Sequence, residues 1–295
     1  MQTVLITGAN GFVGYYLTQL LLKKGFRVIA TGKGENRLYV EDKNFSYQTL
    51  DFTNDEEVEK IFLKQKPETV VHCGAISKPD ECELNKENAF RTNVTGTLYL
   101  LNAAYKLRSF FVFLSTDFVF DGKSGMYKEE DARKAVNYYG ETKILAEDEV
   151  MKYSFGWAIV RTVLVYGKRF LNRDNIVTNV AGKLKKGEEL KIFNDQVRTP
   201  TYVEDLAAGI VSIIEKKATG IYHISGDDVL TPYEIAFAVA NHLKLNSSLI
   251  QKVTEKDFDQ PARRPLKTGL DISKAKKVLG YQPISFTEGL KKTLD

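Results

Sequence analysis

Cysteine and histidine are scarce in this sequence. Its 295 residues include 2 cysteines and 3 histidines, and neither residue type shows the paired spacing of a zinc site or a disulfide framework. Cys73 lies in an apolar run, where a cysteine usually behaves as a small hydrophobic residue. We therefore expect neither a bound metal nor a structural disulfide.

Long hydrophobic runs and a strong charge of one sign are also missing. No apolar stretch approaches the roughly 20 residues that a membrane-spanning helix needs. The formal net charge is +4, which suits an anionic substrate but is too weak for a nucleic-acid-binding surface. The chain starts directly on the strand-like segment Thr3–Ile6, with no basic leader ahead of it. We expect a cytoplasmic protein with no nucleic-acid or membrane partner.

Short apolar segments alternate with helical patterns through the first half of the chain. Fully apolar strands bracketed by helices are typical of a parallel sheet that is covered on both faces. The pattern predicts an α/β fold with a doubly wound parallel sheet of the Rossmann type. The expected strands are 4–7, 27–31, 69–73, 110–114 and 157–161, and the expected helices are 11–24, 55–64, 88–107 and 139–152.

The pattern changes after Tyr166, where basic and polar residues become more frequent and most of the prolines occur. We expect a dinucleotide-binding domain over residues 1–166 and a smaller, mostly substrate-binding cap over residues 167–295. A strand-like segment at 220–224 indicates that part of the chain, about 200–225, returns to the main sheet.

A glycine-rich segment joins the first expected strand to the first expected helix. Gly8 permits a tight turn, Gly11 lets the backbone approach a pyrophosphate, and Gly14 lets helix and strand pack closely. The helix N-terminus supplies free N–H groups and the positive end of the helix dipole. This context favours a dinucleotide site over a turn that serves packing alone. The segment consists of Gly8, Ala9, Asn10, Gly11, Phe12, Val13 and Gly14.

The end of the second expected strand carries no carboxylate. An NAD enzyme usually places Asp or Glu there to hold the ribose hydroxyls, whereas this chain has Gly32 and Lys33, followed by Arg37. These two cations favour the 2′-phosphate of NADP(H); NAD(H) stays open, since both cations could be ordinary loop charges. Asp51 and Phe52 follow a third expected strand, where Asp51 is either an acceptor for the adenine amino group or an exposed turn residue.

Tyr139 and Lys143 are four residues apart in an expected helix, so they project on one face. A nearby ammonium group stabilises a phenolate and lowers the pKa of the tyrosine. Thr116 comes at the end of an expected strand, where its hydroxyl can bind a substrate carbonyl. Tyr138 lies well around the helix from Lys143, so Tyr139 is the better candidate. The set predicts reduction or oxidation of a carbonyl/alcohol pair; the alternative is a packed Tyr/Lys pair with Thr116 as a helix cap.

Four ordered segments resemble the extended short-chain dehydrogenase/reductases, and above all the dTDP-4-dehydrorhamnose reductases. They are residues 114–122, 137–143, 160–167 and 264–271. The resemblance implies a 4-keto nucleotide-sugar substrate, NADPH as reductant, Tyr139 as proton donor, Lys143 as its modulator and Thr116 as carbonyl binder. By the same resemblance, the expected substrate contacts are Asp117, Asn175, Arg198 and Arg264; the last three could equally be ordinary surface residues.

Two other functions remain open. The chain also resembles the β-subunit of methionine adenosyltransferase, in its longer region from Gly32 to Tyr47 and in the segments around Asp117 and Tyr139. That family implies a nucleotide-binding regulatory subunit without catalysis. An NAD-dependent epimerase or dehydratase is disfavoured by the missing strand-end carboxylate and by Phe118, where dehydratases carry a glutamate. The helix expected at 88–107 leaves a homodimer open.

Overall fold

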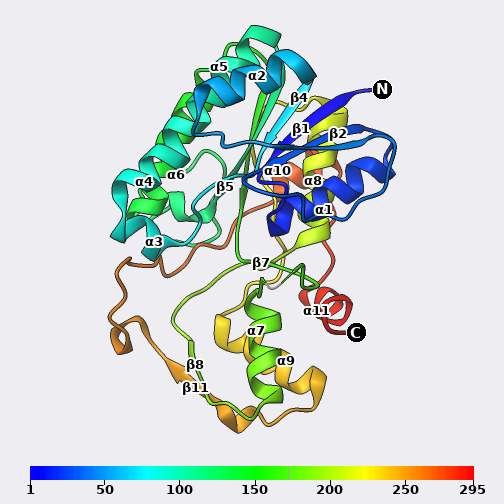
Figure 1. Ribbon diagram of the computed structural model, residues 1–295. Helices are drawn as coiled ribbons and strands as arrows, with labels where there is room; N and C mark the ends of the chain where they lie inside the picture. Colours follow the sequence, from blue (N-terminus) through cyan, green and yellow to red (C-terminus); the bar gives the residue numbers. More distant parts are fainter. Residues whose placement is uncertain (172) are drawn as a thin grey trace.

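The protein is built on a seven-stranded parallel sheet, as seen in a computed structural model that describes residues 1–171 and 173–295 (Figure 1). The strand order is β10-β6-β5-β4-β1-β2-β3, and every neighbouring pair is parallel. The predicted doubly wound sheet is therefore confirmed. Its strands are β1 (Thr3–Thr7), β2 (Arg27–Gly32), β3 (Phe45–Thr49), β4 (Thr69–His72), β5 (Phe110–Thr116), β6 (Trp157–Thr162) and β10 (Gly220–His223).

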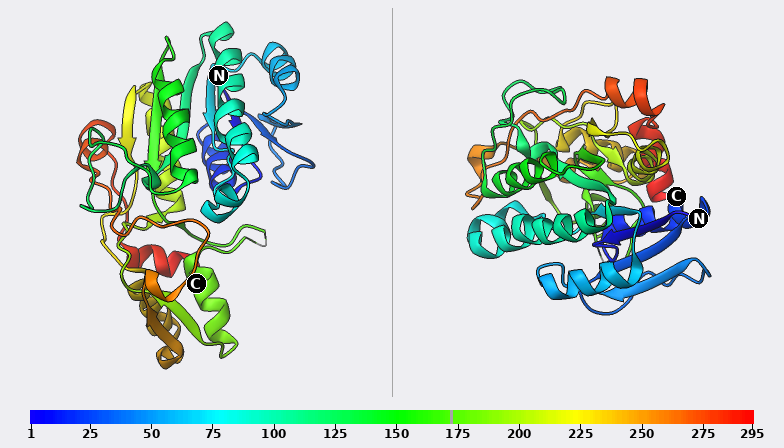
Figure 2. Two further views of the ribbon diagram at one scale, coloured as in Figure 1. Left: turned by 90° about the vertical axis from the view of Figure 1, so that its left-hand side faces the viewer. Right: turned by 90° about the horizontal axis from the view of Figure 1, so that it is seen from above.

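Helices cover both faces of the sheet (Figures 1 and 2). Leu5 and Ile29 face a cluster that includes Phe62, Leu100 and Val150 from the helices of one face. One layer consists of α2 (Asp55–Gln65), α5 (Gly96–Leu107) and α6 (Tyr138–Met151). The other layer consists of α1 (Phe12–Lys23), α8 (Val203–Lys216) and α10 (Ser273–Leu279).

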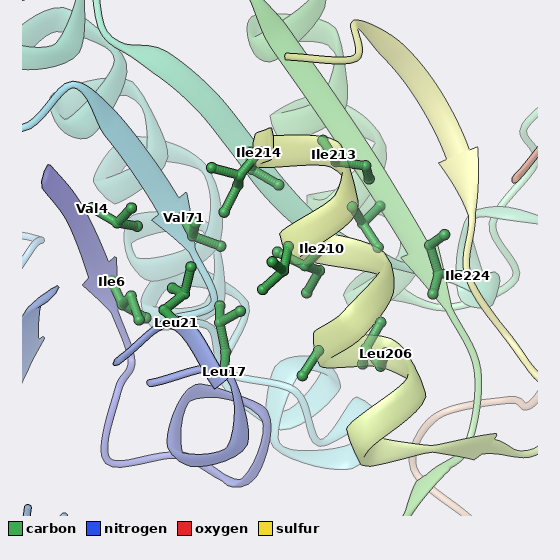
Figure 3. Close-up of a cluster of buried hydrophobic side chains, with 14 of the residues drawn as sticks. Val4, Ile6, Leu17, Leu21, Val71, Leu206, Ile210, Ile213, Ile214 and Ile224 are labelled. Carbon is green, nitrogen blue, oxygen red and sulfur yellow. The ribbon is translucent and has the colours of Figure 1, made fainter. Parts of the chain in front are cut away.

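Successive side chains of each strand point to opposite faces of the sheet, which explains how apolar strands bury both faces. In β1, Val4 and Ile6 point toward α1 and α8, where they meet Leu17, Leu21 and Ile210 (Figure 3). Leu5, between them, belongs to the cluster on the opposite face. A strand with apolar side chains on both faces must be covered on both, which is the pattern that the sequence shows.

The helix expected at residues 88–107 is not regular. It begins as α4 (Lys86–Phe90), widens into the single π-helical turn η1 (Arg91–Thr95), and continues as α5. Such turns often occur at functional sites. The side chain of Asn93, in the π-helical turn, bonds to the backbone of Ile76 outside the helix.

A second lobe with its own apolar core lies below the sheet in Figure 1. It contains α7 (Ile176–Lys185), α9 (Pro232–Leu243), α11 (Phe286–Leu294) and the strands β8 (Leu190–Phe193) and β11 (Ile250–Val253), with η3 (Ser247–Leu249) and η4 (Glu255–Asp257). A small pair, β7 (Val165–Tyr166) and β9 (Thr201–Tyr202), lies between the lobes. Within the described residues, no helix is long and apolar enough to cross a membrane.

The chain returns from the second lobe to the main sheet. β10 pairs with β6, and α8 packs on α1. Residues 203–223 thus lie with the sheet, within the stretch of about 200–225 for which we expected a return. The domain boundary at residue 166 stays a prediction.

Candidate active site

A cavity of about 820 Å³ opens at the carboxyl ends of β1, β2, β4, β5 and β6. It lies beside β1 and β4, where the strand order reverses, which is the place where open α/β sheets bind ligands. Its lining includes both the glycine-rich segment and the three predicted catalytic residues, Thr116, Tyr139 and Lys143.

The glycine-rich segment forms a tight cradle at the start of α1. Gly8 has φ +68°, a left-handed conformation that glycine adopts without strain. A Cβ atom at Gly11 would lie 2.9 Å from the carbonyl oxygen of Gly8, and one at Gly14 would lie 2.5 Å from it. The N-cap Gly11 offers no side-chain bond, and the first turn of α1 has no acidic residue. The free N–H groups of this turn are therefore available to a phosphate.

The loop after β2 is held in place by Asn10 of the glycine-rich segment. Its Nδ2 donates to the carbonyl oxygen of Glu35 at 2.9 Å and to the hydroxyl of Tyr47 at 2.8 Å. Its Oδ1 accepts from the backbone N–H of Arg37 at 3.1 Å. Lys33 and Arg37 both line the cavity. The predicted contact of these two cations with the 2′-phosphate of a dinucleotide stays a prediction.

Asp51 is tied to the same loop. Its Oδ2 lies 2.9 Å from Nζ of Lys33. Burial raises the pKa of Asp51, but hydrogen bonds from Lys33 and Thr53 outweigh it and lower the pKa. The cavity lining includes Phe52 but not Asp51. The predicted contact between Asp51 and adenine stays a prediction.

Thr116 ends β5, and its side chain caps the short helix η2 (Asp117–Val119). Its hydroxyl accepts from the backbone N–H of Phe118 at 3.2 Å and donates to Oδ1 of Asp117 at 3.1 Å. Burial raises the pKa of Asp117, whereas the charge of Arg198 and a hydrogen bond from Thr268 act to lower it. The capping role that we set against catalysis is present, and the hydroxyl still lines the cavity.

Tyr139 stands in the first turn of α6, where the side chain of Asn137 accepts from the N–H of Gly140 at 2.9 Å and caps the helix. Burial raises the pKa of Tyr139; the nearby side chain of Thr116 acts to lower it, and the charge of Asp117 raises it further. This direction is the opposite of the lowered pKa that we expected. The phenol therefore stays protonated at neutral pH.

Lys143 is buried one turn further along α6. Its Nζ donates to the carbonyl oxygen of Leu114 at 2.7 Å and lies 3.9 Å from the ring centre of Phe113. Burial lowers the pKa of Lys143 to about 7, although the charge of Glu147 acts to raise it. The ammonium group points to a backbone carbonyl, and burial sets the direction of the Tyr139 pKa shift.

Asn175 caps a helix and lies outside the cavity lining. Its Oδ1 accepts from the N–H groups of Val177 and Thr178 at the start of α7, at 3.1 and 3.3 Å. Its Nδ2 donates to the carbonyl oxygen of Gly167 at 2.8 Å. These contacts have a structural role, and the predicted contact with substrate stays a prediction.

The two arginines predicted to contact the substrate also have partners within the protein, and neither belongs to the cavity lining. Arg198 is buried and donates to the carbonyl oxygens of residues 197, 265 and 266, and its Nε lies 3.9 Å from Asp117. Arg264 forms a two-pronged ion pair with Asp80 of α3 (Pro79–Leu84), at 2.5 and 2.7 Å. Either arginine would have to exchange these bonds for a phosphate.

Asn93 is linked to the backbone of Tyr139 through Thr142, a role that we did not predict. Its Nδ2 donates to Oγ1 of Thr142 at 3.0 Å, and Thr142 donates to the carbonyl oxygen of Tyr139 at 2.7 Å. Its other bonds hold the backbone of Ile76, which lines the cavity. The π-helical turn that contains Asn93 is visible only in the structure.

Glu147 forms a buried ionic network that we also did not predict. It accepts from Arg161 at 2.8 and 2.9 Å, from Arg133 at 3.2 Å and from the hydroxyl of Ser115 at 2.6 Å. The network joins α6 to β5 and β6, one turn beyond Lys143. Its partners stand 14 to 32 residues from Glu147 in the chain, so no local sequence pattern could have indicated it.

Known sequences resemble this chain along its whole length. A dTDP-4-dehydrorhamnose reductase of Aggregatibacter actinomycetemcomitans is 32% identical over 99% of this chain and 98% of its own length. A methionine adenosyltransferase 2 subunit beta of Xenopus laevis is 30% identical over 99% of this chain and 87% of its own length.

Solved structures share the fold. The dTDP-4-dehydrorhamnose reductase of Clostridium acetobutylicum has a TM-score of 0.88 at 31% identity, covering 100% of this chain and 99% of that one. The reductase of Bacillus anthracis, solved in complex with NADP, has a TM-score of 0.86 at 28% identity, with 99% and 98% covered. The family model described as the RmlD substrate binding domain matches residues 1–295. Together these matches show that the chain belongs to the RmlD substrate binding domain family.

Proposed function

We propose that this protein is a reductase that uses NADPH to reduce the keto group of a nucleotide-linked 4-keto sugar. The observation that carries the proposal is the single cavity lined by both the glycine-rich segment and the set of Thr116, Tyr139 and Lys143. The relatives named dTDP-4-dehydrorhamnose reductase support the substrate class. The relatives named as a subunit of methionine adenosyltransferase keep a regulatory subunit as the second candidate.

The residues of the cavity fit a dinucleotide. The cradle around Gly8 and Gly11 has no room for side chains and presents free N–H groups to a pyrophosphate. Lys33 and Arg37 match the 2′-phosphate of NADP(H). The B. anthracis relative was solved with NADP, which supports the same cofactor here. NADPH, when bound, supplies the hydride for the reduction.

The protein's own groups supply the proton and hold the keto oxygen. Tyr139 is protonated at neutral pH because its pKa is raised, which is the state that a proton donor requires. The hydroxyl of Thr116 turns from Asp117 to the keto oxygen and fixes its position. A charged Lys143, one turn further along α6 than Tyr139, stabilises the phenolate that remains after proton transfer.

The residues expected to contact the substrate fall into two groups according to their hydrogen-bond partners in the protein. Arg198 is held by backbone carbonyls beside Asp117, so we assign it to orienting Asp117 at the substrate. Arg264 and Asn175 stay our candidates for the diphosphate of the substrate, since an arginine fork suits phosphate oxygens.

The test is NADPH oxidation, followed by absorbance, with a panel of 4-keto-6-deoxy nucleotide sugars. Removing the phenol hydroxyl with Tyr139→Phe should lower kcat by about 10²–10⁴, the usual contribution of a positioned general acid. Tyr138→Phe is the matched control, because its ring lies outside the cavity lining with Lys86 5.1 Å from its centre. Wild-type protein that binds NADPH tightly but turns over no sugar of the panel would contradict the reductase and favour the regulatory subunit.

A further inference from the structure

Arg173 lines the cavity but belongs to none of the groups assigned so far. Its Nη1 lies 3.9 Å from the position that a Cβ atom at Gly11 would take. Gly11 is the N-cap of α1 and the residue whose backbone faces the pyrophosphate in our proposal. The guanidinium group therefore stands next to the glycine cradle.

The backbone near Arg173 is anchored on the same helix. The buried ring of Phe170 stacks on Tyr15 of α1, with ring centres 3.9 Å apart and an angle of 10° between the planes. The hydroxyl of Tyr16 donates to the carbonyl oxygen of Lys168 at 2.7 Å. The N–H of Arg173 in turn donates to the carbonyl oxygen of Phe170 at 3.4 Å. Packing on α1 thus brings Arg173 to the start of that helix.

Two positive groups meet at the start of α1, where the side chain of Arg173 is exposed. The positive end of the α1 dipole has no acidic residue in its first turn, and Arg173 adds a second positive group beside it. Its neighbour Arg169 pairs with Asp174 at 3.2 Å, whereas no ion pair found among the described residues includes Arg173. An anion bound between the N-terminus of α1 and the guanidinium group would be attracted by both positive groups.

We propose that Arg173 binds the pyrophosphate of the dinucleotide on the side opposite the N–H groups of α1. The inference rests on the proposed use of NADPH and adds a residue to that site. An arginine fork can donate two parallel hydrogen bonds to phosphate oxygens. Arg173 thereby serves the pyrophosphate that NADPH and NADH share, and Lys33 and Arg37 serve the 2′-phosphate that distinguishes them.

The test is the dissociation constant of four ligands, NADPH, NADH, adenosine 2′-monophosphate and thymidine diphosphate, measured by calorimetry with the full-length protein. Arg173→Gln should weaken the binding of NADPH and NADH by the same factor, on the order of 10-fold, as expected for loss of a charged hydrogen bond. It should leave adenosine 2′-monophosphate unchanged, because that ligand has no pyrophosphate. Arg169→Gln is the matched control on the same loop and should bind all four ligands like the wild type. Arg37→Gln should weaken NADPH more than NADH.

Three results would overturn the inference. In the first, Arg173→Gln binds both dinucleotides like Arg169→Gln. In the second, it loses affinity for NADPH alone, which would assign the guanidinium group to the 2′-phosphate. In the third, it loses affinity for thymidine diphosphate but not for the dinucleotides, which would assign it to the substrate. Wild-type protein that binds no dinucleotide would overturn the cofactor proposal itself, so the two failures are distinguishable.

Discussion

Lys143 and Glu147 stand one turn apart on α6, both buried, in opposite electrostatic surroundings. Glu147 accepts hydrogen bonds from two arginines and a serine. Lys143 has one backbone carbonyl and the face of an aromatic ring. Accordingly, burial lowers the pKa of Lys143 to about 7.

The two environments indicate a structural role for the charge of Glu147 and a functional role for the charge of Lys143. A buried carboxylate with several charged partners is satisfied, and it fixes α6 against β5 and β6. A buried ammonium group without a counter-ion weakens the fold, and such groups are concentrated at functional sites. The ionic network around Glu147 thus holds in place the helix that carries Lys143.

Breaking the network at Glu147 should have the largest effect on stability. Glu147→Ala leaves Arg161 buried without its partner, and we expect the free energy of unfolding to fall by about 3–5 kcal/mol. Urea unfolding measures it. Glu149→Ala, on the same helix, removes a pair with Lys152 at the surface and should change stability by less than about 1 kcal/mol. Equal effects of the two substitutions would refute the structural role of the network.

Replacing Lys143 should increase the stability of the fold, whereas replacing Glu147 should decrease it. Lys143→Met keeps the length of the side chain and removes the buried charge, so stability at pH 7 should rise by about 1–2 kcal/mol while reductase activity is lost. Thermal or urea unfolding gives the first result and NADPH oxidation the second. A destabilised Lys143→Met protein would mean that the bond to Leu114 outweighs the cost of burial.

The pH dependence of stability gives an independent check on Lys143. The pKa of Lys143 is about 7 in the folded protein, below its ordinary value of 10.5, so above pH 7 the unfolded chain binds this proton more tightly than the folded one does. The Lys143 contribution to the free energy of unfolding should therefore rise from about pH 7 to 10. Comparing Lys143→Met with the wild type isolates it. Parallel curves for the two proteins would argue against the lowered pKa.

An ion pair nearer the surface should have the smallest effect. Arg264 and Asp80 are well aligned, but Asp80 is partly exposed. Asp80→Asn should lower stability by about 1 kcal/mol or less, because water screens the pair. Urea unfolding tests this value. A loss as large as that of Glu147→Ala would show that alignment, and not burial, decides the contribution of an ion pair here.

The parts of the site that follow from local patterns could be predicted from sequence. Gly8, Gly11 and Gly14 indicated a helix N-terminus after β1, and the cradle has that geometry. Thr116 follows from the rule that the carboxyl ends of parallel strands meet at one edge of the sheet, and Tyr139 follows from its spacing of four residues from Lys143 in an expected helix. Both line the cavity.

The parts that depend on distant contacts could not be predicted. The pKa of Tyr139 is raised because the side chain is buried, and helical spacing does not reveal burial. The partners of Arg198 are carbonyls up to 68 residues away, and those of Glu147 lie on other strands and loops. The place of Arg173 depends on the stacking of Phe170 on Tyr15. Side-chain pairing of this kind carries no periodic signal.

Transfer of deuterium from NADPH labelled at nicotinamide C4 tests the central claim most directly. We expect mass spectrometry to show the label in the sugar of a 4-keto-6-deoxy nucleotide sugar with the wild type, and almost none with Tyr139→Phe. Tightly bound NADPH with no label in the sugar, or label that enters from deuterated water alone, would contradict a reductase at this site.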